Sequence, residues 1–167
     1  IALSLVGSEM CIRDRQSMEK DYPEIKVSYE FVDAVAMRLV QWPSSYDVLI
    51  TSNLFGDILT DEASVISGSM GLMPSASIGL ENALYEPIHG SYPEATGKKI
   101  ANPIASILSL SMMLDHSFNL KGESKIINRA VEDSLVNKFT TPDLNKDNKA
   151  YTTDEVGDYI VNFIINN

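Results

Sequence analysis

Cysteine, basic side chains and long apolar runs are all scarce in this chain of 167 residues. Its single cysteine cannot form an internal disulfide, which excludes a disulfide-stabilised secreted fold. Thirteen lysines and arginines against twenty-three aspartates and glutamates give a net charge of -10, which repels nucleic-acid phosphates and anionic membranes. No apolar run approaches the ~20 residues that a membrane-spanning helix needs. We therefore expect a cytoplasmic protein that binds neither nucleic acid nor a membrane.

The segment 1–15 differs in character from the rest of the chain. It opens with the apolar run Ile1–Val6, which has neither the preceding basic region nor the small-residue cleavage site of a signal peptide. One interpretation is a short buried strand. The other is that residues 3–15 resemble translated sequencing-adapter read-through. Because the chain also lacks an initiating methionine, we expect residues 1–15 to be non-native and the reading frame to be truncated at its N-terminus. Sequencing the locus distinguishes the two interpretations.

Two carboxylates four residues apart, Asp57 and Asp61, form the most informative pattern. The run Tyr46–Thr51 predicts a buried strand, and Asn53–Glu62 predicts a helix directly after it. A spacing of four places both carboxylates on one helix face, where a divalent cation would relieve their repulsion. Open α/β sheets bind ligands beyond the carboxyl ends of their strands, which is where this pair lies. The alternative is the solvated acidic face of an ordinary surface helix.

Asp33 occupies a comparable place between a predicted strand and a predicted helix. Alternation in Lys26–Val32 indicates a strand with one buried face, and Ala34–Gln41 predicts an apolar helix that ends before Pro43. An aspartate at such a junction commonly caps the helix. Its similarity of position to Asp57 also makes Asp33 a candidate ligand.

The second half of the chain predicts a long loop followed by helices. Glycine, proline and polar residues fill the segment 89–102, and long ordered loops in compact domains usually have functions. A helix over 103–118 is apolar on nearly every side, which predicts a central position. Further helices are expected at 123–136 and 153–165. The last of these opens with Thr152 and Glu155, a capping-box pattern.

Four motifs occur in an order that is typical of one enzyme family. Together they resemble the C-terminal half of the isocitrate/isopropylmalate dehydrogenases, which are β-decarboxylating dehydrogenases, from about Gln16 to the end. Several motifs in order are much more specific than any single one. The motifs are Val32–Met37, Asn53–Ser64, Gly71–Ala76 and Tyr85–Ser91.

The resemblance implies an α/β fold of the two-subdomain sheet type found in that family, truncated here at the N-terminus. Residues 16–67 would form the end of the dimerising, metal-binding subdomain. Residues 68–167 would form the C-terminal part of the NAD-binding subdomain.

The resemblance also implies an oxidoreductase activity. The expected reaction is the NAD-linked, Mg²⁺- or Mn²⁺-dependent oxidative decarboxylation of 3-isopropylmalate to 4-methyl-2-oxopentanoate in leucine biosynthesis. By resemblance, Asp57 and Asp61 bind the metal, and Asp33 reaches the metal and substrate from the partner subunit of a homodimer. The lysine and tyrosine that transfer protons in the family would lie upstream, so no catalytic residue is assigned here and the isolated fragment is expected to be inactive.

The loop 89–102 matches the family's NAD site, which is unrelated to the Gly-x-Gly-x-x-Gly fingerprint. Glu94 stands where the family usually has aspartate, one methylene shorter, and an acid at this place favours NAD over NADP because it can accept hydrogen bonds from ribose hydroxyls. By resemblance, the residues that contact the cofactor are His89, Gly90, Ser91, Tyr92, Pro93, Glu94, Gly97, Lys98 and Asn102.

Two alternatives stay open at this point. Homoisocitrate and tartrate dehydrogenases belong to the same family, and the residues that select the substrate side chain lie outside this chain. A non-catalytic regulatory subunit that binds metal or nucleotide is the alternative from another class. The presence of Asp33, Asp57, Asp61 and the loop that starts at His89 weighs against the regulatory alternative.

Overall fold

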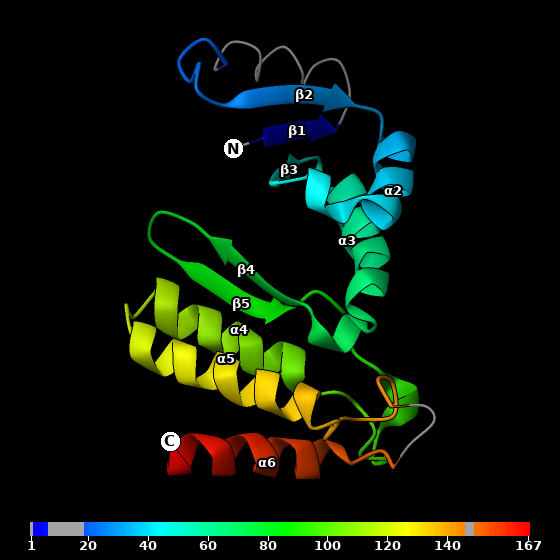
Figure 1. The fold of residues 1–167 in the computed structure, drawn as a ribbon, viewed down its shortest axis with the longest axis vertical. Helices are drawn as coiled ribbons and strands as arrows, with labels where there is room; N and C mark the ends of the chain where they lie inside the picture. The colour runs from blue at the N-terminus through cyan, green and yellow to red at the C-terminus, as the bar shows by residue number, and fades with distance from the viewer. Residues whose placement is uncertain (1, 7–18, 146–148) are drawn as a thin grey trace. The chain divides into compact units, whose positions relative to one another are not determined.

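The computed structural model describes residues 2–6, 19–145 and 149–167 (Figure 1). The chain divides into two compact units, Ile1–Ile66 and Ser67–Asn167, which we call unit 1 and unit 2. Each unit combines helices with a small sheet, and each is described by itself below. Among the described residues, no helix is both long enough and apolar enough to cross a membrane.

Unit 1 contains a parallel sheet with the strand order β2-β1-β3. β1 is Ala2–Val6, β2 is Lys26–Glu30 and β3 is Val48–Ile50. The strand β1 agrees with the interpretation of the run Ile1–Val6 as a short strand. The non-native origin of the segment 1–15 stays a prediction. The strands predicted at Lys26–Val32 and Tyr46–Thr51 are confirmed, and both are shorter than expected. The expected burial of β3 is wrong, because Val48 and Ile50 are exposed in this chain.

Two helices connect and follow the strands of unit 1. α2 covers Val32–Gln41 and α3 covers Asn53–Ser67, and their buried side chains Val35, Leu39 and Leu59 form the core of the unit. Parallel strands need such crossover connections, which explains the helix between β2 and β3. Gly68, with φ of 92°, follows α3 in the left-handed conformation that glycine commonly adopts at the C-terminal end of a helix.

The structure corrects the interpretation of Asp33 as a helix cap. α2 begins at Val32 with Phe31 in the capping position, so Asp33 lies inside the first turn. Its Oδ1 accepts a hydrogen bond of 2.9 Å from the backbone N–H of Ala34. The carboxylate is favourable there because the first turn of a helix exposes free N–H groups and a partial positive charge.

Unit 2 is built in layers (Figure 1). The antiparallel strands β4 (Pro74–Ile78) and β5 (Ala83–Pro87) pack against α4 (Ile104–His116). α4 packs in turn against α5 (Lys121–Val136), and α5 packs against α6 (Thr153–Asn166). The central position predicted for the 103–118 helix is therefore confirmed. The core residues are Ile104, Ala130, Val131, Val156 and Ile160.

The capping box at the start of α6 is confirmed. Glu155 Oε2 accepts a bond of 2.8 Å from the backbone N–H of Thr152, and Thr152 Oγ1 accepts one of 3.3 Å from the N–H of Glu155. The segment 140–145 has a polar sequence and is irregular. It is nevertheless packed into the unit, because Thr140, Thr141 and Asn145 are all buried. This packing places Asp143 against the loop 89–102.

Candidate functional site

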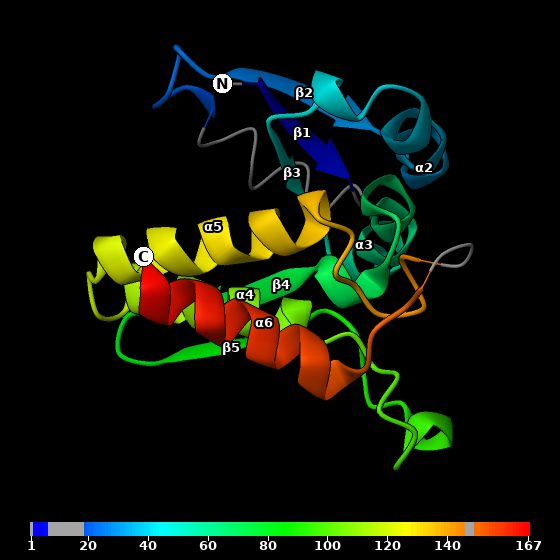
Figure 2. The ribbon, with the colours of Figure 1, turned by 60° about the horizontal axis from the view of Figure 1, so that its bottom comes forward.

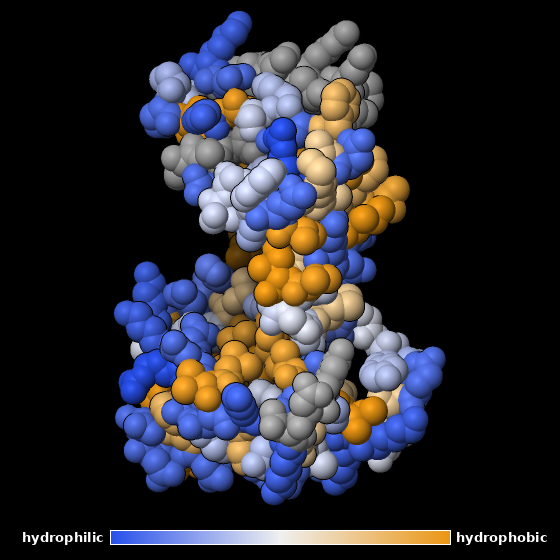
Figure 3. Space-filling view, turned by 45° about the vertical axis from the view of Figure 1, so that its right-hand side comes forward, coloured by the Kyte–Doolittle hydropathy of each residue, from blue (hydrophilic) through white to orange (hydrophobic). Residues whose placement is uncertain are grey.

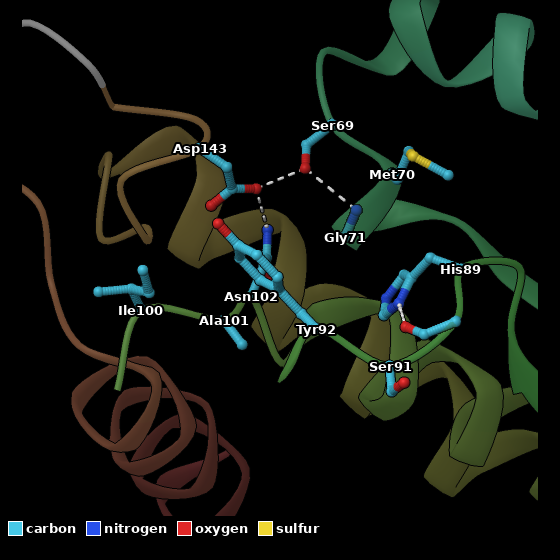
Figure 4. Close-up of a pocket in the computed structure, with 11 residues that line it drawn as sticks. Ser69, Met70, Gly71, His89, Ser91, Tyr92, Ile100, Ala101, Asn102 and Asp143 are labelled. Atoms are coloured by element: carbon cyan, nitrogen blue, oxygen red, sulfur yellow. Dashed lines mark hydrogen bonds between the residues drawn. The ribbon is translucent and has the colours of Figure 1, made fainter. Parts of the chain in front are cut away.

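A pocket of about 500 Å³ opens in unit 2 beside the loop 89–102 (Figure 4). Its walls come from three parts of the chain: the turn that includes the short 3-10 helix Met70–Leu72, the two ends of the loop, and the segment that contains Asp143. Five of the eleven lining residues are glycine, alanine or serine, whose small side chains allow a ligand to approach the main chain closely. The lining residues are Ser69, Met70, Gly71, His89, Gly90, Ser91, Tyr92, Ile100, Ala101, Asn102 and Asp143.

The carboxylate of Asp143 joins these three parts of the wall. Its Oδ2 accepts hydrogen bonds from the Ser69 hydroxyl and from Asn102 Nδ2, the latter at 3.0 Å, and its Oδ1 accepts one of 2.6 Å from Thr141 Oγ1. Figure 4 shows Ser69 and Asn102 converging on this carboxylate. Ser69 Oγ also accepts from the backbone N–H of Gly71 at 3.0 Å, so the network extends into the turn.

Hydrogen bonding determines the charge of Asp143. Burial raises the pKa of its carboxyl group, but the hydrogen bonds from Ser69, Thr141 and Asn102 lower it, and the net pKa lies below the ordinary value of 3.8. The carboxylate is therefore ionised at neutral pH, and the donors that stabilise it are uncharged side chains. Such charge-assisted bonds are stronger than bonds between neutral groups.

Gly71 and Asn102 lie in unusually close contact at the same wall. A Cβ atom built on Gly71 would lie 2.6 Å from Cβ of Asn102 and 3.0 Å from its Cγ. Any side chain at position 71 would therefore displace Asn102, and glycine is required there for steric reasons. Asn102 Oδ1 meanwhile accepts a bond of 3.0 Å from the N–H of Ile104 at the start of α4.

The loop 89–102 is fixed near both ends. The N–H of Ile88 donates to the carbonyl of Met73 at 3.1 Å just before the loop begins. Near its other end, Lys99 Nζ forms an ion pair of 2.5 Å with Asp154, and Thr153 Oγ1 donates to the carbonyl of Ala101 at 2.6 Å. The two ends of the loop are thereby held to Met73, which directly precedes β4, and to α6.

Five of the nine residues expected at the cofactor site line the pocket, namely His89, Gly90, Ser91, Tyr92 and Asn102. The other four do not line it. Pro93 and Glu94 lie in the short 3-10 helix Pro93–Ala95, and Gly97 and Lys98 follow it; all four are exposed. Figure 2 shows this part of the loop extending from unit 2.

Sequence reasoning did not assign six of the lining residues: Ser69, Met70, Gly71, Ile100, Ala101 and Asp143. Gly71 stands in a motif that was quoted for the family resemblance, and Ile100 and Ala101 lie within the expected loop. Asp143 had no such signal, because it follows a short polar stretch that predicts only a loop.

The acidic pair lies on unit 1, as predicted. Asp57 and Asp61 are both exposed on α3, and Asn53 Nδ2 donates to Asp57 Oδ2 at 3.2 Å. Within the described part of the chain, no group of three His, Cys, Asp or Glu side chains is placed to hold a metal ion. One copy of the chain therefore does not bring Asp33 together with the pair. Contribution of Asp33 by a partner subunit stays a prediction.

Comparison with known proteins identifies the class. The profile described as isocitrate/isopropylmalate dehydrogenase matches residues 8–160. The chain belongs to this family, and the α/β fold inferred from the sequence is confirmed. Isocitrate dehydrogenase from Methylococcus capsulatus is similar in structure, with a TM-score of 0.90 and 36% identity over 98% of this chain and 50% of that chain. A β-decarboxylating dehydrogenase from Thermococcus kodakarensis has a TM-score of 0.79 and 34% identity over 98% and 49%.

Curated relatives give a more specific name. The 3-isopropylmalate dehydrogenase of Bacteroides fragilis is 47% identical over 161 residues, which are 96% of this chain and 45% of the relative. That of Oceanobacillus iheyensis is 54% identical over 131 residues, 78% of this chain and 36% of the relative. The chain thus spans less than half the length of these curated relatives.

The lowered pKa of Asp143 predicts a pH dependence of stability. The unfolded chain binds a proton at this group near pH 3.8, whereas the folded chain binds it only at lower pH. The stabilisation is complete above the unfolded pKa and is lost as the pH falls through the folded pKa. We expect the free energy of unfolding to decrease more steeply below about pH 4 in the wild type than in Asp143→Asn. Urea denaturation between about pH 6 and 3 measures this, and equal slopes would contradict the assignment.

Proposed function

We propose that this chain is part of a metal-dependent, NAD-linked 3-isopropylmalate dehydrogenase of leucine biosynthesis. The 47% identity to the Bacteroides fragilis relative over 96% of the chain carries the proposal. In this proposal residues 16–67 complete the metal-binding subdomain, and residues 68–167 form the C-terminal part of the NAD-binding subdomain. The reaction converts a 2-hydroxy dicarboxylate and NAD into a 2-keto monocarboxylate, carbon dioxide and NADH, the carbon dioxide coming from the carboxylate on C3.

The residues of unit 1 fit a divalent cation. Asp57 and Asp61 offer hard carboxylate oxygens from one exposed helix face, and these are the ligands that Mg²⁺ and Mn²⁺ prefer. The Asn53 amide restricts the orientation of the Asp57 carboxylate. Asp33 of a second copy would complete the set. When bound, the cation supplies Lewis acidity at the substrate oxygens.

The pocket of unit 2 fits one part of a dinucleotide. Tyr92 offers an exposed aromatic face, and the backbone at Gly90 is open, because a Cβ atom built there would meet nothing within 4 Å. Ser91 and Asn102 add hydroxyl and amide groups for hydrogen bonds with polar groups of the cofactor. When bound, NAD accepts the hydride that leaves the substrate carbon.

A chimera tests the metal assignment and the proposed activity together. In it, residues 16–167 replace the matching segment of the Bacteroides fragilis enzyme. We expect NAD- and Mg²⁺-dependent oxidation of 3-isopropylmalate, and Asp57→Asn should reduce kcat by about a hundredfold or more while NAD affinity stays nearly constant. NADH absorbance measures turnover, and fluorescence titration measures binding.

Glu62→Gln is the matched control for this experiment. Glu62 is a carboxylate on the same helix, but its position is rotated by about 100° from that of Asp61. Its replacement should leave turnover nearly unchanged. Equal losses of turnover and of NAD binding in Asp57→Asn would indicate misfolding, and an inactive chimera with normal folding would favour the regulatory alternative.

We further propose that Glu94 favours NAD over NADP. Its carboxylate can accept a hydrogen bond from a ribose hydroxyl, whereas the 2′-phosphate of NADP would bring like charge close to it. Because Glu94 is exposed and outside the pocket wall, solvent weakens this repulsion.

Replacement of Glu94 tests the cofactor preference. In the chimera, Glu94→Ser should shift the ratio of kcat/KM for NAD to that for NADP toward NADP by about fivefold, mainly through better NADP binding. Glu86→Ser, which replaces an exposed glutamate of β5 outside the loop, is the control. Equal use of both cofactors by the unsubstituted chimera would refute the proposal.

Apolar side chains on α2 and α3 support a homodimer. Met37 and Val40 on α2 are about half exposed, and Leu54 and Ile58 on α3 are exposed by 65% and 52%. Val65, later in α3, is 70% exposed. Figure 3 shows hydrophobic side chains at the surface of unit 1. This apolar surface could pack against a second copy of the chain. Because α3 also carries Asp57 and Asp61, the second copy would then bring its own Asp33 to the metal.

Charge on the apolar face should separate the subunits. We expect the chimera to be a dimer at micromolar concentration and Val65→Glu to shift it toward a monomer of low activity, because a buried unpaired charge at an interface is unfavourable. Sedimentation velocity measures the oligomeric state. Ser44→Glu, at an exposed site in the 3-10 helix Pro43–Ser45, is the control. A fully active monomer would rule out the shared site.

A further inference from the structure

We propose that Asp143 is a positioning residue, which fixes the wall of the dinucleotide pocket by holding Asn102 and Ser69. This inference rests on the proposed NAD function of the same pocket. Asp143 lies outside the loop 89–102, which is the segment that matches the family's NAD site by resemblance.

Asn102 is held from opposite ends of its amide group. Its Nδ2 donates to Asp143 at 3.0 Å, and its Oδ1 accepts from the N–H of Ile104 at 3.0 Å. The orientation of this amide is thus determined by one carboxylate and by the first turn of α4. Loss of either partner would weaken the control of this half-buried amide. Because the loop ends at Asn102, the end of the loop would be less well fixed.

The position of Asn102 also determines that of the neighbouring turn 69–71 at the same wall of the pocket. The Gly71 backbone lies so close that a Cβ atom there would come within 2.6 Å of Asn102. Ser69 connects the same turn to Asp143 by accepting from the N–H of Gly71 and donating to the carboxylate. A displaced Asn102 would therefore also displace the turn 69–71, and both belong to the lining.

The chemistry of the network requires an oxygen at Oδ2. Two donors, the Ser69 hydroxyl and the Asn102 amide, point at this atom, and an amide NH₂ cannot accept a hydrogen bond. Oδ1 accepts a bond from Thr141, whose hydroxyl could rotate and accept instead. Asp143→Asn can thus preserve the more important half of the network, whereas Asp143→Ala removes all of it.

The kinetic test uses the chimera with residues 16–167. We expect Asp143→Ala to raise KM for NAD by about tenfold with kcat within about twofold, because it loosens the pocket without touching the reacting atoms. Asp143→Asn should recover most of the affinity, and Ser69→Ala should raise KM by a smaller factor. If Asp143→Ala does not fold, Ser69→Ala keeps the test open, and a normal KM for NAD in that variant would then overturn the inference.

Asp133→Ala is the matched control. The Asp133 carboxylate accepts a bond of 2.6 Å from the Tyr159 hydroxyl, which joins α5 to α6 away from the pocket lining. We expect this variant to lose stability while its KM for NAD stays unchanged. If both aspartate variants raised KM equally, Asp143 would have only a general structural role.

Amide hydrogen exchange separates failure of this inference from failure of the proposed function. Asp143→Ala should accelerate exchange at the N–H groups of Gly71 and Ile104, whereas Asp133→Ala should not. If the unsubstituted chimera binds no NAD, the proposed function fails even where exchange responds as expected. If it binds NAD but Asp143→Ala changes neither KM nor these exchange rates, the positioning role is refuted.

Discussion

The structure of the candidate cofactor pocket depends on one carboxylate that binds three neutral donors. Asp143 connects Ser69, Asn102 and Thr141, which belong to different parts of unit 2. Burial favours its protonated form, and the hydrogen bonds from these donors favour the ionised form, with a net lowering of the pKa. An ion stabilised by oriented dipoles is costly to disturb, because displacing any donor leaves charge unsatisfied in a partly buried place.

Features that depend on nearby residues could be predicted from the sequence. The placement of Asp57 and Asp61 on one helix and the capping box of Thr152 and Glu155 each involve neighbours within a few residues, and both are found in the structure. The junction at Asp33 was predicted less well. The helix starts one residue before it, a shift that local propensity does not resolve but that changes the role of this carboxylate from cap to first-turn acid.

The role of Asp143 could not be predicted, because it depends on residues that are distant in the chain. Its hydrogen bonds to Ser69 and Asn102 connect residues that lie 74 and 41 positions apart in the chain. No periodicity marks such a pair, and the stretch that contains Asp143 has the composition of an exposed loop. Thr140 and Thr141 are buried by tertiary packing within unit 2. This packing makes the polar stretch that contains Asp143 part of the pocket wall. The contact between Gly71 and Asn102 is likewise a property of the fold and not of either local sequence.

The loop 89–102 combines fixed ends with an exposed middle, and this division bears on what each part can do for a cofactor. Ile88 and Ala101 are hydrogen-bonded to the main body, and Asn102 is oriented from both ends of its amide, so groups near the ends can recognise a ligand without first losing much conformational entropy. Glu94, in the middle, is exposed and does not line the pocket. An exposed carboxylate is screened by water and salt, so its influence on a nearby phosphate is modest. Affinity for the dinucleotide should therefore reside mainly in the fixed ends that Asp143 supports, and Glu94 should act mainly on the choice between two forms of the same cofactor.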